Sequence, residues 1–282
     1  MGGGILLPLL APATYCFMFI TGFYGIRFSR KTFYKIILQL IIAAVLCCTL
    51  VWMIFDSFNI QHFVGAFVPV STSFWWFMMN YLIIMLLSPI IDPGIRSITK
   101  SQFRYIVIVL WLIQFVSYIK LNNSAGSSFL GLFSVFILGR FCGIYKVVPS
   151  LKISIYCFIL AWVLQIATML TCANVAPKYL FTTLNYNTVP LTAMSVMLFY
   201  IFYNLPVWKN HRLNTILRPT LFIYLITEGL SKPLYLSLYN LYVHNVFLFV
   251  VAIIFLIMSC MFIGCLIDII SNKLLLVLTK EQ

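Results

Sequence analysis

Long apolar runs separated by short polar clusters are the feature that most constrains how this chain can fold. Nine runs are expected to span the membrane, at 5–26, 36–55, 74–91, 105–119, 129–148, 151–172, 187–207, 219–240 and 244–270. A helix needs about 20 apolar residues to cross the hydrocarbon core of a bilayer. Only 8% of the residues are charged, which excludes a water-soluble globular fold, since such domains carry roughly a quarter. We therefore predict a single all-α domain over residues 1–282, a polytopic transmembrane helical bundle of about nine spans.

The positive charges alternate along the chain with the predicted spans. Short cytoplasmic loops hold most of the Lys and Arg of a membrane protein. Of the 18 Lys and Arg residues, 14 fall on one predicted side: Arg27, Arg30, Lys31, Lys35, Arg96, Lys100, Arg104, Lys146, Lys152, Lys209, Arg212, Arg218, Lys273 and Lys280. This pattern predicts a cytoplasmic C-terminus and, with nine spans, an N-terminus outside. The net charge of +13 thus indicates topology, and we expect no nucleic-acid partner.

The densest basic cluster contains Arg27, Arg30 and Lys31, directly after the first predicted span. One interpretation is a topology determinant that also contacts anionic membrane lipid. The other is a docking site for an anionic substrate. The forked donors of Arg suit phosphate, and a phosphorylated acyl carrier such as coenzyme A is a natural ligand.

Arg140 and Glu228 are charges that fall inside predicted spans. An intramembrane charge is by default a functional candidate, although Arg140 is near enough to the predicted cytoplasmic end to snorkel to the interface. Gly139 and Gly143 flank Arg140 at a spacing that allows close helix approach. The predicted partner of Glu228 is Lys232 or, across helices, Arg140. Together with Tyr224, Glu228 could also line a polar cavity.

Aromatic residues and turn signals bound the third span. Trp75 and Trp76 are expected in an interfacial belt, and Ser88-Pro89 with Asp92-Pro93-Gly94 is expected to close the helix. The eight cysteines and three histidines form no recognisable ligand or catalytic spacing. We predict no metal site and no resident cofactor.

Five segments in order resemble the acyltransferase-three family of integral membrane O-acyltransferases. They are FMFITGFYGIRFSRKTFYKI, WWFMMNYLIIMLLSPIID, SVFILGRFCGIYK, LNYNTVPLTAMSVMLFYIFYNL and LFIYLITEGL. The family carries a similar "FxxISGxxG" helix before a basic stretch, then a "WFxxxYxxxxxxSP" helix, a "YNSP" segment and a "YLIHE" segment. The resemblance covers the chain from about Tyr15 to the last span.

The resemblance implies a multi-pass enzyme of the bacterial inner membrane. Such an enzyme moves an acyl group, typically acetyl, from cytoplasmic acyl-CoA to a hydroxyl on a surface polysaccharide or a lipid-linked sugar precursor. By position, Arg27, Arg30 and Lys31 resemble the motif associated with the acyl donor. Trp76, Tyr81 and Pro89 resemble the tryptophan-helix signature, and Tyr224 and Glu228 the late signature, with Thr227 at the family's histidine.

The chain departs from the family pattern at its N-terminal end. Family members commonly have ten core spans, and their first helix carries an arginine and the histidine thought to be the general base. This chain opens on MGGGILLP, which resembles the loop after that histidine. The odd span count expected from charge agrees with a missing first helix, so we expect an N-terminally shortened member: a mis-assigned start codon, a fragment or a truncated paralogue. If translation starts at Met1, we expect little or no transferase activity, because no remaining residue supplies a positioned base.

Two other functions are compatible with the same sequence. A transporter or flippase for lipid-linked sugar would share the basic inner face, the aromatic residues and a broken eighth helix. A non-catalytic membrane subunit or degenerate paralogue would explain the missing helix.

Overall fold

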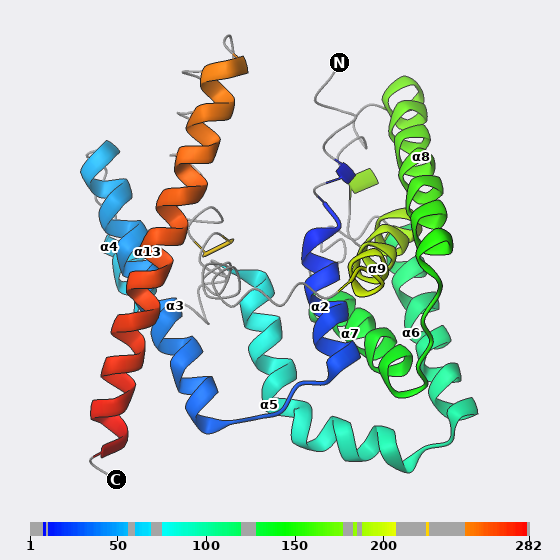
Figure 1. Ribbon diagram of the computed structural model, residues 1–282, viewed down its shortest axis with the longest axis horizontal. Coiled ribbons are helices and arrows are strands. Elements are labelled where there is room, and N and C mark those ends of the chain that lie inside the picture. Colours follow the sequence, from blue (N-terminus) through cyan, green and yellow to red (C-terminus); the bar gives the residue numbers. More distant parts are fainter. Residues whose placement is uncertain are drawn as a thin grey trace. The chain divides into compact units, whose positions relative to one another are not determined.

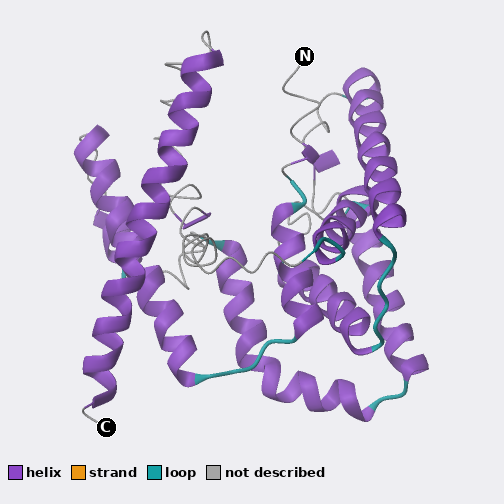
Figure 2. Cartoon of the chain, in the orientation of Figure 1, coloured by secondary structure: helices purple, strands orange, loops and turns teal. Residues whose placement is uncertain are grey.

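A computed structural model describes residues 8–9, 11–55, 60–68, 75–119, 128–176, 183–184, 188–206, 224–225 and 246–280. Every regular element among these residues is helical (Figure 2). The predicted all-α class is therefore confirmed for the part of the chain that the structure describes.

The chain divides into two compact units, which are described separately. The first unit contains residues 1–28 and 80–207, and the second contains residues 29–79 and 208–282. The division falls inside one helix, α5 (Trp76–Ser97), whose residues from Asn80 onward belong to the first unit.

Five further helices form the first unit: α2 (Ala13–Tyr24), α6 (Lys100–Ile119), α7 (Phe129–Ile144), α8 (Leu151–Val175) and α9 (Val189–Tyr203) (Figure 1). The closest packing joins α2 to α7, because glycines replace side chains at the contact. A Cβ on Gly22 would lie 2.9 Å from the carbonyl carbon of Phe136, and one on Gly139 would lie 3.0 Å from the amide nitrogen of Phe23. The predicted role of Gly139 and Gly143 in close helix approach is confirmed, since a Cβ on Gly143 would meet the backbone of Phe23.

An aromatic cluster joins α9 to α2 in the first unit. The Phe19 ring lies 5.3 Å from that of Phe199, and the Phe23 ring lies 5.3 Å from that of Tyr203, between centroids. Near the start of α2, the Ser195 hydroxyl in the middle of α9 donates to the carbonyl of Pro12 over 2.9 Å. Going from Pro12 to Phe23 along α2, the contacts move from Ser195 to Tyr203 on α9. The two helices therefore run parallel.

The remaining directions follow from contacts in the same unit. The Tyr200 hydroxyl on α9 donates to the carbonyl of Val147, just after α7, over 2.6 Å, so α7 and α9 end together. The Phe103 ring at the start of α6 lies 5.3 Å from that of Phe141 near the end of α7, so α6 runs opposite to α7. Buried Ala161 on α8 packs with Leu191 on α9. The relative directions of α2, α6, α7 and α9 agree with those that the alternating charges predict.

The second unit contains α3 (Arg30–Phe55), α4 (Ile60–Ala66) and α13 (Val246–Lys280). The first part of α3 lies against the second half of α13, where Lys35 Nζ is 2.8 Å from Asp268 Oδ1. The Gln39 side-chain amide donates to the same carboxylate oxygen over 3.0 Å and lies 3.3 Å from the Ser271 hydroxyl. These polar side chains fix the register of two otherwise apolar helices.

Four helices of the described residues are long and apolar enough to cross a membrane. Their spanning stretches are Arg30–Met53, Trp76–Ser97, Leu151–Val175 and Val250–Leu275, and α2, α7 and α9 are shorter apolar helices. Many of their large apolar side chains are exposed, such as Phe255 on α13, which is 74% exposed. Such faces fit a lipid surrounding, so the membrane character of the chain is supported.

Several predicted boundaries were correct and others were wrong. The helices α7 and α8 begin at Phe129 and Leu151, the residues expected. The prediction that Pro89 and Asp92-Pro93-Gly94 close the third span was wrong, because α5 continues through both prolines to Ser97 and bends in its second half (Figure 1). Membrane helices tolerate proline when neighbouring groups satisfy the freed backbone carbonyls, and here the Ser88 hydroxyl donates to the carbonyl of Met85 over 2.8 Å.

Several cations that were expected in loops lie in the first turns of helices. The cations Arg30, Lys31 and Lys35 were expected in a loop but lie in α3, and Lys100 and Arg104 lie in α6. The short helix α4 occupies a stretch expected to be an outer loop. Apolar runs locate the hydrocarbon core, whereas a helix can continue through its basic flank into the interface.

Candidate functional site

An ion pair joins α7 to α5 in the first unit. Arg140 on α7 is 8% exposed, and its guanidinium binds the carboxylate of Asp92 on α5 through two bonds. Nε donates to Oδ1 over 2.9 Å and Nη2 donates to Oδ2 over 3.0 Å. This forked geometry is the strong form of an Arg–carboxylate interaction, and it fixes the plane of the guanidinium.

The turn after α2 closes over this guanidinium. Gly25 adopts a φ of +78°, a left-handed conformation that glycine accepts without strain. A Cβ added at Gly25 would lie 2.6 Å from Nη1 of Arg140. Only a glycine therefore fits between the end of α2 and Arg140, and the second glycine of the ITGFYG segment has a steric role here.

The turn leads directly to the predicted donor-binding residues. Arg27 is exposed, two residues after Gly25, and belongs to the first unit. Arg30 and Lys31 are exposed in the first turn of α3 and belong to the second unit. Arg27 thus follows the turn that contacts Arg140, while Arg30 and Lys31 are described with their own unit.

Asp92 was missed as a site residue because its Pro-Gly neighbours suggested a turn. It is the only acidic residue within residues 1–28 and 80–207, and a count of acids near Arg140 could have drawn attention to it. The snorkelling interpretation of Arg140 was wrong, because the side chain is buried and binds Asp92. The interpretation of Arg140 as a functional residue stays a prediction. Glu228 and the side chains of the three histidines lie outside the described residues.

The start of the tryptophan-helix segment contacts the late segment in the second unit. Trp75 is 2% exposed, and its indole nitrogen donates to the carbonyl of Leu225 over 3.0 Å. The ring of Phe77 contacts that of Tyr224 edge-on, at 5.8 Å between centroids. The prediction that Trp75 lies in an interfacial belt was therefore wrong, because this side chain is an internal contact between two segments.

The other predicted cavity residues are distributed between the units. Trp76 is partly buried, with its ring 6.3 Å from that of Phe77 in the second unit. Tyr81 is partly buried on the portion of α5 that belongs to the first unit. The described residues bring Arg140 close to the turn that precedes Arg27, and they bring Tyr224 close to the residue after Trp76.

Comparisons with protein-family models, curated proteins and solved structures found no match to this chain.

Proposed function

We propose that the chain is a multi-pass membrane protein that binds acyl-CoA and transfers its acyl group to a sugar hydroxyl of a surface polysaccharide or lipid-linked precursor. In this proposal the chain has about nine spans, lies in a bacterial inner membrane and has its C-terminus in the cytoplasm. Acyl-CoA is a co-substrate, and no resident cofactor takes part.

The observation that carries the proposal is the contact between the turn after α2 and Arg140. Gly25, Asp92 and Arg140 come from three of the five segments that resemble the acyltransferase-three family. A chance similarity of apolar helices has no reason to place the polar and glycine positions of three separate segments against one another. The late signature and the tryptophan signature likewise meet through Trp75 and Leu225.

Arg27, Arg30 and Lys31 are the proposed donor-binding residues. Their exposed guanidinium and ammonium groups suit the phosphates of coenzyme A. Arg140 acts as a positioning residue, because it packs against the turn that leads to Arg27. In the transfer, the sugar oxygen forms the new ester bond, the thioester C–S bond breaks, and the CoA thiol receives the proton that the hydroxyl loses.

The test measures CoA binding separately from transfer. Purified chain in mild detergent is titrated with acetyl-CoA, using wild type, Arg27→Gln/Arg30→Gln/Lys31→Gln and a control of equal charge loss, Lys209→Gln/Lys273→Gln/Lys280→Gln. Because a charge-assisted hydrogen bond contributes roughly 1.5–3 kcal/mol, we expect at least about tenfold weaker binding in the first variant only. Wild-type chain that does not bind acetyl-CoA, or equal losses in both variants, would contradict the proposal.

Transfer is measured in membranes that carry the chain, with radiolabelled acetyl-CoA and extraction of lipid-linked and polymeric sugars. Label that appears in sugar esters and depends on Arg27, Arg30 and Lys31 supports the enzyme. Transport of unmodified lipid-linked sugar without ester formation favours the flippase instead.

A further inference from the structure

The first unit has exposed cations that its own carboxylate cannot neutralise. Asp92 is the only acidic residue in residues 1–28 and 80–207, and both its oxygens bind Arg140. At the same end of the unit, five other cations are exposed on α5, α6, the α7–α8 loop and α8: Arg96, Lys100, Arg104, Lys146 and Lys152. Their counter-charges must come from outside this unit.

Contacts between α6 and α7 hold two of these cations close together. The Lys100 ammonium lies over the ring of Tyr145, 5.0 Å from its centroid. Tyr145 is the residue before Lys146, and its ring lies 6.3 Å from that of Phe103. The start of α6 is thereby attached to the end of α7, and Lys100 and Lys146 belong to one surface.

The loop that carries Lys146 is held by α9. Lys146 has a φ of +51°, the one left-handed non-glycine residue among those described. The Tyr200 hydroxyl donates to the carbonyl of Val147, and the Asn204 side-chain amide donates to that of Pro149 over 3.1 Å. The amide of Val147 closes the end of α7 by donating to the carbonyl of Cys142 over 3.0 Å. Tyr200 on α9 and Asn204 just after this helix thus fix the backbone that carries Lys146.

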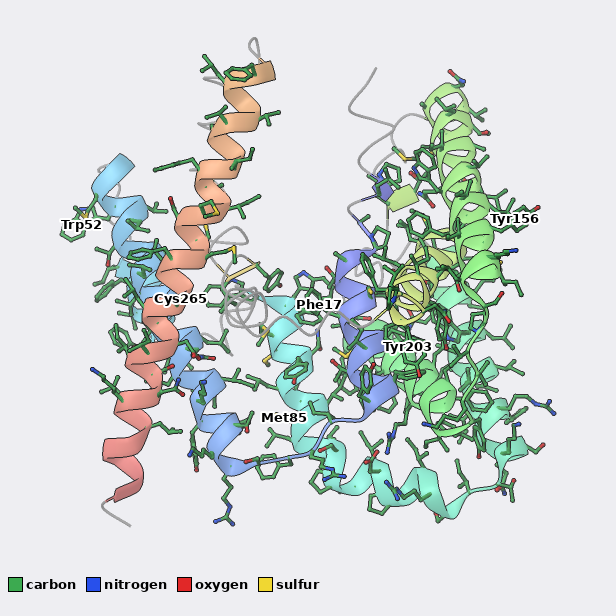
Figure 3. The ribbon with its side chains drawn as sticks, viewed as in Figure 1. Phe17, Trp52, Met85, Tyr156, Tyr203 and Cys265 are labelled. Atoms are coloured by element: carbon green, nitrogen blue, oxygen red, sulfur yellow. The ribbon has the colours of Figure 1, made fainter. Side chains whose placement is uncertain are left out.

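Exposed apolar and aromatic side chains adjoin the cations. Tyr105 on α6 and Tyr156 on α8 are each 69% exposed, and Tyr156 projects away from the neighbouring helices (Figure 3). Ile153, next to Lys152, is 54% exposed. Apolar side chains exposed on membrane helices face acyl chains, so cations at this position lie level with lipid headgroups.

We propose that Lys100, Lys146 and Lys152 bind the phosphate headgroup of an anionic phospholipid. The inference goes beyond the proposed function and uses neither its residues nor its ligand. The positive charge of the three lysines favours anionic over zwitterionic lipid. The adjoining apolar surface favours a lipid over a soluble phosphate. The loop that carries Lys146 is already fixed by its hydrogen bonds, so binding requires no ordering of this backbone.

The first experiment counts lipids that remain bound to the full chain. Wild type is purified from mixed phosphatidylglycerol and phosphatidylcholine micelles, and bound lipid is quantified by mass spectrometry. A lysine near an anionic surface contributes roughly fivefold to affinity, so three lysines contribute on the order of 100-fold. We expect Lys100→Gln/Lys146→Gln/Lys152→Gln to lose at least about tenfold of its preference for phosphatidylglycerol, and Lys100→Arg/Lys146→Arg/Lys152→Arg to keep it.

The control separates a specific site from general attraction. Lys209→Gln/Lys273→Gln/Lys280→Gln removes the same charge from the second unit, and we expect it to lose clearly less of the preference for phosphatidylglycerol than the first glutamine variant. Equal losses in the two glutamine variants would overturn the proposal, as would a wild type with no preference for phosphatidylglycerol.

A second measurement uses only wild type, in case the glutamine variant inserts wrongly. The chain is reconstituted in nanodiscs of either lipid, and the acetylation rate of each lysine is read by peptide mass spectrometry. Lys100, Lys146 and Lys152 are expected to react at least about fivefold more slowly in phosphatidylglycerol, whereas Lys273 changes less. Equal rates in both lipids would overturn the proposal. So would protection by soluble coenzyme A in phosphatidylcholine that matches the protection by phosphatidylglycerol, because the phosphate source would then be soluble.

Discussion

Replacing Gly143 with Ala tests the closest helix contact that the glycines of the described residues make. A Cβ at this position would lie 2.8 Å from the carbonyl carbon of Phe23 and closer still to its oxygen. Ordinary contacts of this kind begin at 3.4 Å, so the backbones of α7 and α2 must separate by at least about 0.6 Å. No side chain can move aside instead, since both partners are backbone atoms. Overpacking of this kind costs roughly 1–3 kcal/mol.

Gly94→Ala is the matched control, because a Cβ on this α5 residue would meet nothing within 4 Å. Both substitutions gain up to about 1 kcal/mol of helix propensity, so the difference between the variants isolates the overpacking. At roughly 2–4 °C per kcal/mol for a chain of this size, Gly143→Ala is expected to melt roughly 2–12 °C below Gly94→Ala.

The assay follows the reaction of a thiol-specific fluorescent dye during heating in detergent. All eight cysteines are free, and Cys16, Cys47, Cys142 and Cys260 are buried, so unfolding exposes new thiols. A Gly143→Ala variant that melts at or above Gly94→Ala would refute the steric reasoning and the packing of α2 against α7.

Three further predictions concern Asp92, Gly25 and Trp75. Asp92→Ala leaves the Arg140 guanidinium buried without its carboxylate, which costs about 3–5 kcal/mol. The double variant Asp92→Ala/Arg140→Met should recover stability, and strictly additive losses in melting temperature would show that the two side chains are not coupled. Gly25→Ala forces a side chain into a left-handed turn against Arg140, at a cost of about 1–3 kcal/mol. We expect a lower melting temperature and weaker acetyl-CoA binding. Unchanged binding would show that this turn does not affect the donor site. Trp75→Phe removes the indole donor from the buried carbonyl of Leu225 and leaves it the weaker Cys47 thiol donor at 3.9 Å, at a cost of about 1–3 kcal/mol. We expect Trp76→Phe to melt close to wild type, and a Trp76→Phe variant that melts below Trp75→Phe would contradict the internal position of Trp75.

The positions of the long helices were predictable because hydropathy reports where lipid lies. The runs beginning at Phe129 and Leu151 match α7 and α8 at their first residues. Gly139 and Gly143 also predicted the packed face of α7 correctly, because small residues four positions apart let the backbone of another helix approach closely. These features depend on local sequence alone.

The pairing at the site was not predictable in the same way. A Pro-Gly sequence after Asp92 is typical of a turn in water, yet in α5 it is part of a helix that delivers Asp92 to Arg140. The partner of Arg140 depends on which helices are neighbours, and hydropathy does not encode that. The same limit applies to Trp75, whose position at the end of an apolar run is equally compatible with an interface and with an internal contact to Leu225.

The common direction of α2, α7 and α9 affects the electrostatics of the first unit. Each helix carries a backbone dipole equivalent to about half a negative charge at its C-terminus and half a positive charge at its N-terminus. At the end where α2, α5, α7 and α9 finish and α6 and α8 begin, the backbone therefore contributes a net charge of about −1. The peptide groups at this end therefore attract the Lys and Arg side chains electrostatically. This attraction is present whether or not a ligand is bound.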